Sequence, residues 1–164
     1  MAEMTQEEKK ETSEILQLVG FKIGQEEFGI NILAVQEIIK IIDITKVPNA
    51  SEFIEGVINL RGRIIPIVHL RKRLGMPVID LDKNSRIIVV EISGKTIGFI
   101  VDEVQEVLRI STEITEKPPE LVSGVDSDYI VAVAKLDERL LILLDLEKTL
   151  ANDELDELEK VADK

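Results

Sequence analysis

Short apolar runs separated by turn residues fill most of the chain. Runs of four to eight residues that are rich in Ile and Val and bounded by Gly, Pro, Asn or Asp are typical of β-strands. By this pattern we predict strands at residues 15–23, 27–33, 38–44, 57–58, 64–68, 86–92, 95–101, 104–110, 121–125, 129–136 and 139–144. Many short strands with a turn about every 8–12 residues predict a mostly β protein, built as barrels or as a sandwich.

From Asp145 onward the apolar residues recur at helical spacing instead. Acids and lysines occupy the other positions, which predicts a C-terminal amphipathic helix over residues 147–164 with one face docked. The apolar stripe consists of Leu146, Leu150, Leu155, Leu158 and Val161. We also predict short helical turns at residues 51–56, with Ser51 as N-cap, and at residues 70–74, ended by Gly75.

The segment of residues 56–74 is predicted to contain a hairpin whose turn is Asn59-Leu60-Arg61-Gly62. Pro66 cannot donate a ladder hydrogen bond, so we expect its strand at a sheet edge or a bulge. The segment contains no acid, although the whole chain has a net charge of −12. Its cations are Arg61, Arg63, Arg71, Lys72 and Arg73. The turn is explained either by geometry alone or by recognition of a partner through Leu60 and Arg61.

An internal repeat narrows the fold. Phe28-Gly29 recurs as Ile97-Gly98, and residues 35–38 (VQEI) recur as residues 104–107 (VQEV), in both cases 69 positions later. Residues 64–70 resemble residues 140–146 at a spacing of 76. A unit of about 70 residues is too small for a large core of its own. We therefore predict two small barrels related by pseudo-two-fold symmetry, one from residues 14–85 and the other from residues 86–146.

Composition excludes several classes of function. The 164 residues include no Cys and a single His, His69, which excludes thiolate and two-His zinc sites. The acidic balance and the 3% aromatic content disfavour nucleic-acid and sugar binding. No apolar run reaches the roughly 18 residues of a membrane span, and residues 1–13 look like a flexible acidic tail without a secretory signal. We predict a soluble intracellular protein with a structural His69.

Two chemical alternatives remain open at this point. Asp80, Asp82, Asn84 and Glu91 occupy ligand positions of a calcium-binding loop, but Ser85 replaces the turn glycine and no flanking helices are predicted. Carboxylate pairs such as Glu26-Glu27 could in principle support acid–base chemistry. The alternative function is therefore a small acidic enzyme or a calcium-binding domain. The apolar residues Ile32, Leu33, Val35 and Ile38 are compatible with a core or with a partly exposed groove.

Three segments carry a resemblance to a known family. Residues 56–71 (GVINLRGRIIPIVHLR), 28–38 (FGINILAVQEI) and 97–108 (IGFIVDEVQEVL) strongly resemble the CheW-like domain family of bacterial chemotaxis. The similarity extends from about residue 15 to residue 150. His69 departs from the family pattern, which commonly has Asp at this position.

The resemblance implies a fold of two five-stranded SH3-like barrels and a non-enzymatic function without cofactor or metal. CheW-like adaptors couple the cytoplasmic tip of a chemoreceptor to the histidine kinase CheA, in arrays on the inner face of the membrane. The receptor tip is a helical hairpin, which suits recognition of a helix in a groove. The receptor-binding residues implied are Ile32, Leu33, Val35, Glu37, Asn59, Leu60, Arg61, Gly62, Val101 and Val104. For the kinase contact we expect Arg63 and Ile65.

Overall fold

The computed structural model describes residues 14–117, 129–150 and 152–162. The predicted tail at residues 1–13 and the predicted strand at residues 121–125 lie outside the described residues. The described strands are β1 (Ile15–Ile23), β2 (Glu26–Asn31), β3 (Val35–Lys40), β4 (Ile54–Leu60), β5 (Arg63–His69), β6 (Arg86–Ile92), β7 (Lys95–Val101), β8 (Glu103–Ser111), β9 (Thr115–Glu116), β10 (Ile130–Leu136) and β11 (Arg139–Leu144). The described helices are η1 (Ile32–Ala34), α2 (Leu70–Arg73), η2 (Thr112–Ile114), η4 (Leu146–Thr149) and α3 (Asn152–Ala162).

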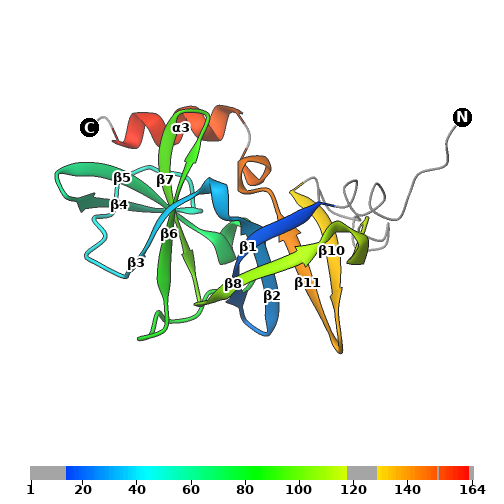
Figure 1. Cartoon of the computed structure of the whole chain (residues 1–164). Helices are drawn as coiled ribbons and strands as arrows, with labels where there is room; N and C mark the ends of the chain where they lie inside the picture. Colours follow the sequence, from blue (N-terminus) through cyan, green and yellow to red (C-terminus); the bar gives the residue numbers. More distant parts are fainter. Residues whose placement is uncertain (1–13, 118–128, 151, 163–164) are drawn as a thin grey trace, which may run out of the picture.

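The strands form two sheets that lie side by side (Figure 1). One sheet has five strands in the order β3-β6-β7-β5-β4, and α3 runs along its upper side in Figure 1. The other has six strands in the order β8-β1-β2-β11-β10-β9. The mostly β fold with two sheets is confirmed, and the sixth strand, the two-residue β9, is an addition to the predicted five.

The internal repeat is confirmed at the level of strand register. Gly29 of β2 lies opposite Gly20 and Leu143, and Gly98 of β7 lies opposite Val89 and Ile67. These partners have the spacings of 69 and 76 that the sequence repeat shows. Both repeats also carry an irregularity at the matching glutamine, near Gln36 in β3 and near Gln105 in β8.

The two repeats exchange strands. The first repeat contributes β3, β4 and β5 to the five-stranded sheet, where they pair with β6 and β7 of the second repeat. The other two strands of the first repeat, β1 and β2, belong to the six-stranded sheet, where they pair with β8 and β11 of the second repeat. The sheets therefore do not follow the predicted boundary between residues 85 and 86.

Three apolar clusters fill the fold. The five-stranded sheet encloses one around Ile67 and Ile87, and the six-stranded sheet encloses another around Leu18 and Leu141. The largest cluster lies between the sheets, where Phe21 and Phe28 stack with ring centroids 5.6 Å apart. Helix α3 covers its end with Leu155 and Leu158. Because the shared cluster joins both sheets, they pack as one unit.

Two local predictions were wrong. Residues 51–56 form no helix, because β4 begins at Ile54. The Ser51 hydroxyl donates a hydrogen bond to the carboxylate of Glu157 in α3 and does not cap a helix. Pro66 is not on an edge strand, because β5 pairs with both β4 and β7. Its missing N–H costs little on either side of the strand. On the β4 side, the opposing Val57 exchanges its backbone hydrogen bonds with Thr45. On the β7 side, pairing begins only at Ile67.

Candidate functional site

The β4–β5 hairpin ends in a two-residue turn of Arg61 and Gly62. Both residues have positive φ, 52° and 84°, as a type I′ turn requires. Asn59 supports the turn, because its Oδ1 accepts a hydrogen bond of 2.9 Å from the Gly62 N–H. The predicted hairpin is confirmed. Arg61 is the unusual residue, since a side chain in the left-handed region costs roughly 1–2 kcal/mol relative to glycine.

An ion pair joins this turn to β3. The guanidinium of Arg61 contacts the carboxylate of Glu37, and the Arg61 side chain remains 71% exposed. The turn is far from β3 in the sheet order, so this contact brings two opposite edges of the five-stranded sheet together. An exposed ion pair adds little to stability, typically about 0–1 kcal/mol. The Arg61 guanidinium is therefore available to a partner.

The short helix η1 presents a second exposed feature. Asn31 caps it by accepting a hydrogen bond of 2.9 Å from the Leu33 N–H. Leu33 is 90% exposed, whereas Ile32 and Val35 are half-buried against the cluster between the sheets. Leu33 therefore leaves almost its whole apolar side chain available for contact with another surface.

The remaining predicted residues divide by burial. Leu60 packs on the cluster inside the five-stranded sheet, and Val104, the repeat counterpart of Val35, packs on the cluster between the sheets. Val101 and Ile65 are each 1% exposed, so their side chains belong to the core and present no contact surface in this structure. Arg63 is exposed and donates a 2.8 Å hydrogen bond to the Thr96 hydroxyl.

Ile64 is an exposed residue that sequence reasoning missed. It is 42% exposed on β5, beside Arg63, and its repeat counterpart Leu140 is 59% exposed on β11. Period-2 alternation would bury Ile64 if Arg63 faced water, but the first two residues of β5 are both exposed. The sequence signal that could have identified this exposed pair was the repeat, since Ile64 and Leu140 occupy matching positions in it.

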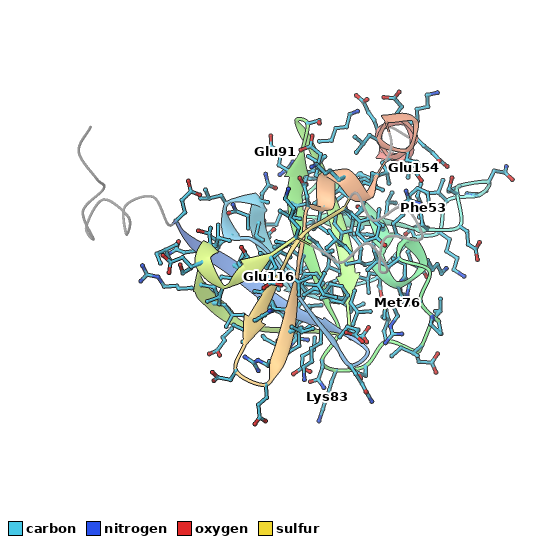
Figure 2. The ribbon with its side chains drawn as sticks, turned by 90° about the vertical axis from the view of Figure 1, so that its right-hand side faces the viewer. Phe53, Met76, Lys83, Glu91, Glu116 and Glu154 are labelled. Carbon is cyan, nitrogen blue, oxygen red and sulfur yellow. The ribbon has the colours of Figure 1, made fainter. Side chains whose placement is uncertain are left out.

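The basic segment is less available than its sequence suggests, because three of its five cations are buried or half-buried in ion pairs. Arg71 is 6% exposed and donates from Nε to Asp102 at 2.9 Å. Lys72 pairs with Glu55 at 3.1 Å. Arg73 pairs with Glu154 at 2.9 Å. The guanidinium of Arg73 also lies 5.3 Å from the ring centroid of Phe53. Phe53 and Glu154 lie close together where α3 meets the five-stranded sheet (Figure 2).

The Arg71–Asp102 pair is a structural link. Burial acts to raise the pKa of Asp102, but hydrogen bonds from Arg71 and from the Gly24 N–H outweigh it and hold that pKa below its ordinary value. The hydrogen bond to Asp102 raises the pKa of Arg71. Gly24 belongs to the β1–β2 turn, so the pair connects the two sheets.

The residues of the candidate calcium loop do not converge. Glu91 lies in β6, where it accepts a hydrogen bond of 3.0 Å from Gln36. Lys83 of the loop and Glu91 lie at opposite ends of the molecule (Figure 2). Asp82 instead accepts from the Asn84 N–H at 2.7 Å, as in a plain turn. Across the described residues, no cluster of three or more Asp, Glu or His side chains could hold a metal ion.

Comparison with known proteins assigns the family. Residues 17–154 match the CheW-like domain. The chain belongs to the CheW-like domain family. It is 38% identical over 142 residues to the chemotaxis protein CheW of Klebsiella aerogenes, covering 87% of this chain and 86% of that relative. It is 39% identical over 134 residues to the chemotaxis protein CheW of Thermotoga maritima, covering 80% and 85%.

The CheW-like fold is also seen in a solved relative. The crystal structure of the scaffolding protein TtCheW from Thermoanaerobacter tengcongensis superposes with a TM-score of 0.78 and is 40% identical in sequence. The match covers 86% of this chain and 91% of that chain. In the described part of this CheW-like chain, no helix has the length and apolar character needed to cross a bilayer.

Proposed function

We propose that this chain is a non-enzymatic chemotaxis adaptor that binds a chemoreceptor cytoplasmic tip and the histidine kinase CheA at the same time. Family membership over residues 17–154 supports the chemotaxis role. The scaffolding function named for the solved relative supports an adaptor. In this proposal the chain reaches receptor arrays on the inner face of the membrane through its partners.

The receptor contact is proposed at the surface that Leu33 and the Arg61 turn present. The observation that carries it is the Arg61 backbone: the chain keeps arginine at φ 52°, where glycine or asparagine costs less, and leaves its side chain 71% exposed. Leu33 supplies the apolar contact. The supporting residues are Ile32, Val35, Glu37, Asn59, Leu60, Gly62 and Val104. A helical receptor tip offers both apolar and polar side chains to such a surface.

The kinase contact is proposed at the outer face of the β4–β5 hairpin. Arg63 is exposed there and is followed by the exposed apolar side chain of Ile64. An arginine beside an exposed aliphatic residue is a common composition for a protein interface. Ile65 takes no part in this contact, because its side chain is 1% exposed.

A rigid body suits this adaptor. The cluster between the sheets and the buried Arg71–Asp102 pair hold both sheets in one arrangement. A displacement of the receptor contact is then transmitted to the kinase contact rather than absorbed between the sheets.

A pull-down with purified partners tests the function. The chain should retain a receptor cytoplasmic fragment and purified CheA, separately and together. A ternary complex that forms only in its presence supports the adaptor. Retention of neither partner by a folded chain contradicts the proposal, and so does retention of one partner that excludes the other.

A further inference from the structure

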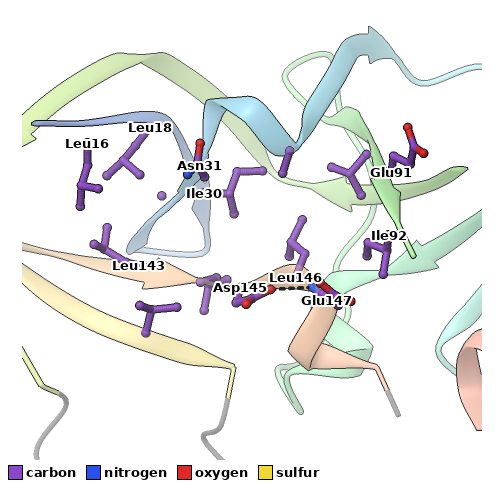
Figure 3. Close-up of a pocket in the computed structure, with 15 residues that line it drawn as sticks. Leu16, Leu18, Ile30, Asn31, Glu91, Ile92, Leu143, Asp145, Leu146 and Glu147 are labelled. Atoms are coloured by element: carbon purple, nitrogen blue, oxygen red, sulfur yellow. Dashed lines mark hydrogen bonds between the residues drawn. The ribbon is translucent and has the colours of Figure 1, made fainter. Parts of the chain in front are cut away.

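A pocket of about 290 Å³ lies between the two sheets (Figure 3). Its apolar wall comes from both of them, with Leu16, Leu18 and Leu143 from the six-stranded sheet and Val90 and Ile92 from the five-stranded sheet. The wall reaches the surface at Val131, which is 53% exposed. The pocket is therefore an apolar recess that remains open to a partner.

Carboxylates and one amide supply the polar part of the lining. They are Asn31, Glu91, Asp145 and Glu147, all labelled in Figure 3. Asp145 accepts from the Glu147 N–H at 3.0 Å, and Glu147 accepts from the Ser93 hydroxyl at 3.0 Å. Glu91 accepts from the Gln36 amide at 3.0 Å. Each carboxylate thus has a neutral donor.

No cation among the described residues balances these charges. The described residues that line the pocket include no Lys, Arg or His. Among the side chains that the structure describes, Glu91, Asp145 and Glu147 form no ion pair. Three negative charges at the mouth of an apolar recess create a potential that favours an occupant with an apolar body and a positive charge.

We propose that this pocket binds a partner segment in which an aliphatic or aromatic side chain lies next to lysine or arginine. The apolar side chain enters the recess, and the neighbouring cation reaches the carboxylates at the mouth. The volume is at the lower end of the range for ligand sites and fits one or two side chains rather than a helix. A single such contact is weak, with a dissociation constant of roughly 1 mM.

Occupancy of the pocket would stabilise the arrangement of the sheets, because both of them contribute to its wall. The exposed residues of the proposed receptor and kinase contacts, Leu33, Arg61 and Arg63, do not line it. The site borders the proposed receptor contact, because Ala34 of η1 and its N-cap Asn31 line it, but it uses other side chains and does not depend on the adaptor function being correct.

Methyl NMR of the full chain tests the proposal with defined peptides. The tetrapeptide Ac-Lys-Leu-Phe-Lys-NH2 is titrated to several millimolar, and shifts are expected at the methyls of Leu16, Leu18, Ile30, Ile92, Val131 and Leu143. Ac-Glu-Leu-Phe-Glu-NH2 and Ac-Lys-Ser-Ser-Lys-NH2 should shift these methyls at least five times less. Equal shifts with the acidic peptide, or no shifts, overturn the proposal.

Paired variants locate the binding. Val131→Lys places a cation at the mouth and should weaken peptide binding at least fivefold, whereas Val107→Lys, at a similarly exposed position outside the pocket, should not. Glu91→Gln should weaken binding about threefold, and Glu106→Gln should not. Equal effects within a pair contradict the assignment. Concentration-dependent shifts of the pocket methyls without peptide would assign the recess to a second copy and also overturn the proposal.

Discussion

His69 and Arg71 are two buried ionisable side chains at the junction of β5 and α2, and they differ in how their burial is compensated. Arg71 keeps its charge, because Asp102 and the Pro77 carbonyl accept its hydrogen bonds. His69 is 4% exposed, and its Nδ1 has no hydrogen-bond partner among the described residues. Burial therefore lowers the pKa of His69, with Lys72 and Arg71 acting in the same direction and Glu55 and Asp102 opposing.

This lowered pKa predicts a pH-dependent stability. The unfolded chain takes up a proton at the ordinary histidine pKa of about 6.5, whereas the folded chain resists it. The contribution is therefore fully present above pH 6.5 and is lost as the pH falls below it. Urea midpoints of the wild type should decrease between pH 7.5 and pH 5.5. His69→Leu should remove most of that decrease, and an unchanged slope in the variant contradicts this role of His69.

Arg61 is the residue whose backbone and side chain have different roles. Asparagine tolerates positive φ well, so Arg61→Asn should leave the melting temperature equal or slightly higher. Loss of a central interface arginine typically costs about 2 kcal/mol or more, so binding of the receptor fragment should weaken about 30-fold. Titration of the fragment and thermal unfolding measure the two effects separately.

The control for Arg61 is Lys135→Asn. Lys135 also forms an exposed cross-strand ion pair, with Glu116 at 2.8 Å, but on the six-stranded sheet. It should leave receptor binding unchanged. If Arg61→Asn lowers the melting temperature strongly while the folded fraction still binds, Arg61 is structural. Arg61→Asp should abolish receptor binding with at most a small change in melting temperature.

At the scale of the elements, the hairpins β1–β2 and β6–β7 are repeat counterparts with the same pairing but unequal packing. A Cβ at Gly98 would lie 2.6 Å from Ile67 Cδ1 and 2.8 Å from Ile87 Cγ2. A Cβ at Gly29 would meet only the ends of leucine side chains, the nearest at 3.3 Å. The five-stranded sheet is therefore closed more tightly around its glycine than the six-stranded sheet.

This difference predicts unequal costs for the same substitution. Gly98→Ala should destabilise the fold by about 1–3 kcal/mol, because Ile87 must move away from its packed position. Gly29→Ala should cost less than about 1 kcal/mol, because leucine ends can adjust. Replacing glycine by alanine also lowers the conformational entropy of the unfolded chain, which stabilises the fold. This stabilisation is the same in both variants and cancels in the comparison. Chemical denaturation measures both, and equal costs would show that the Ile67–Ile87 contact yields easily.

At the scale of the whole molecule, exchange of strands makes the two sheets interdependent. Removal of either repeat takes at least two strands from each sheet, and the cluster between the sheets then loses part of its wall. Helix α3 adds to this dependence, since Glu157 binds Ser51 and Glu154 binds Arg73. Unfolding of the intact chain should be a single cooperative transition.

Separate expression of residues 1–85 and residues 86–164 tests this interdependence. Neither fragment should give a cooperative thermal transition or dispersed amide resonances. An equimolar mixture should recover β-sheet structure, because each fragment supplies the strands that the other lacks. Independent folding of either fragment would contradict the exchange, and it would support the predicted boundary after residue 85.

Much of the fold was predictable because its signals are local. Alternation of apolar residues, the turn Asn59-Leu60-Arg61-Gly62 and the pair Ser93-Gly94 defined the hairpins to within a few residues. The prediction of an edge strand for Pro66 was wrong because the cost of its missing N–H depends on the opposing residue. That residue, Val57, bonds its backbone to Thr45 instead. In the candidate site, Leu33 and Arg61 are exposed as expected, whereas Val101 and Ile65 are buried. An apolar residue in a strand has the same local pattern whether its face meets a core or a partner.

The sequence by itself determined the strands, their hairpins, the repeat and the family, because each depends on residue types a few positions apart or on a motif that recurs. Only the tertiary structure decided that the repeats exchange strands, that Arg71 is paired and buried while Arg61 is exposed, and that a carboxylate-lined recess lies between the sheets. These features arise from contacts between distant segments, such as Arg71 with Asp102 and Ser93 with Glu147. Burial and charge at such contacts depend on the partner side chain, and no local pattern encodes which partner that is.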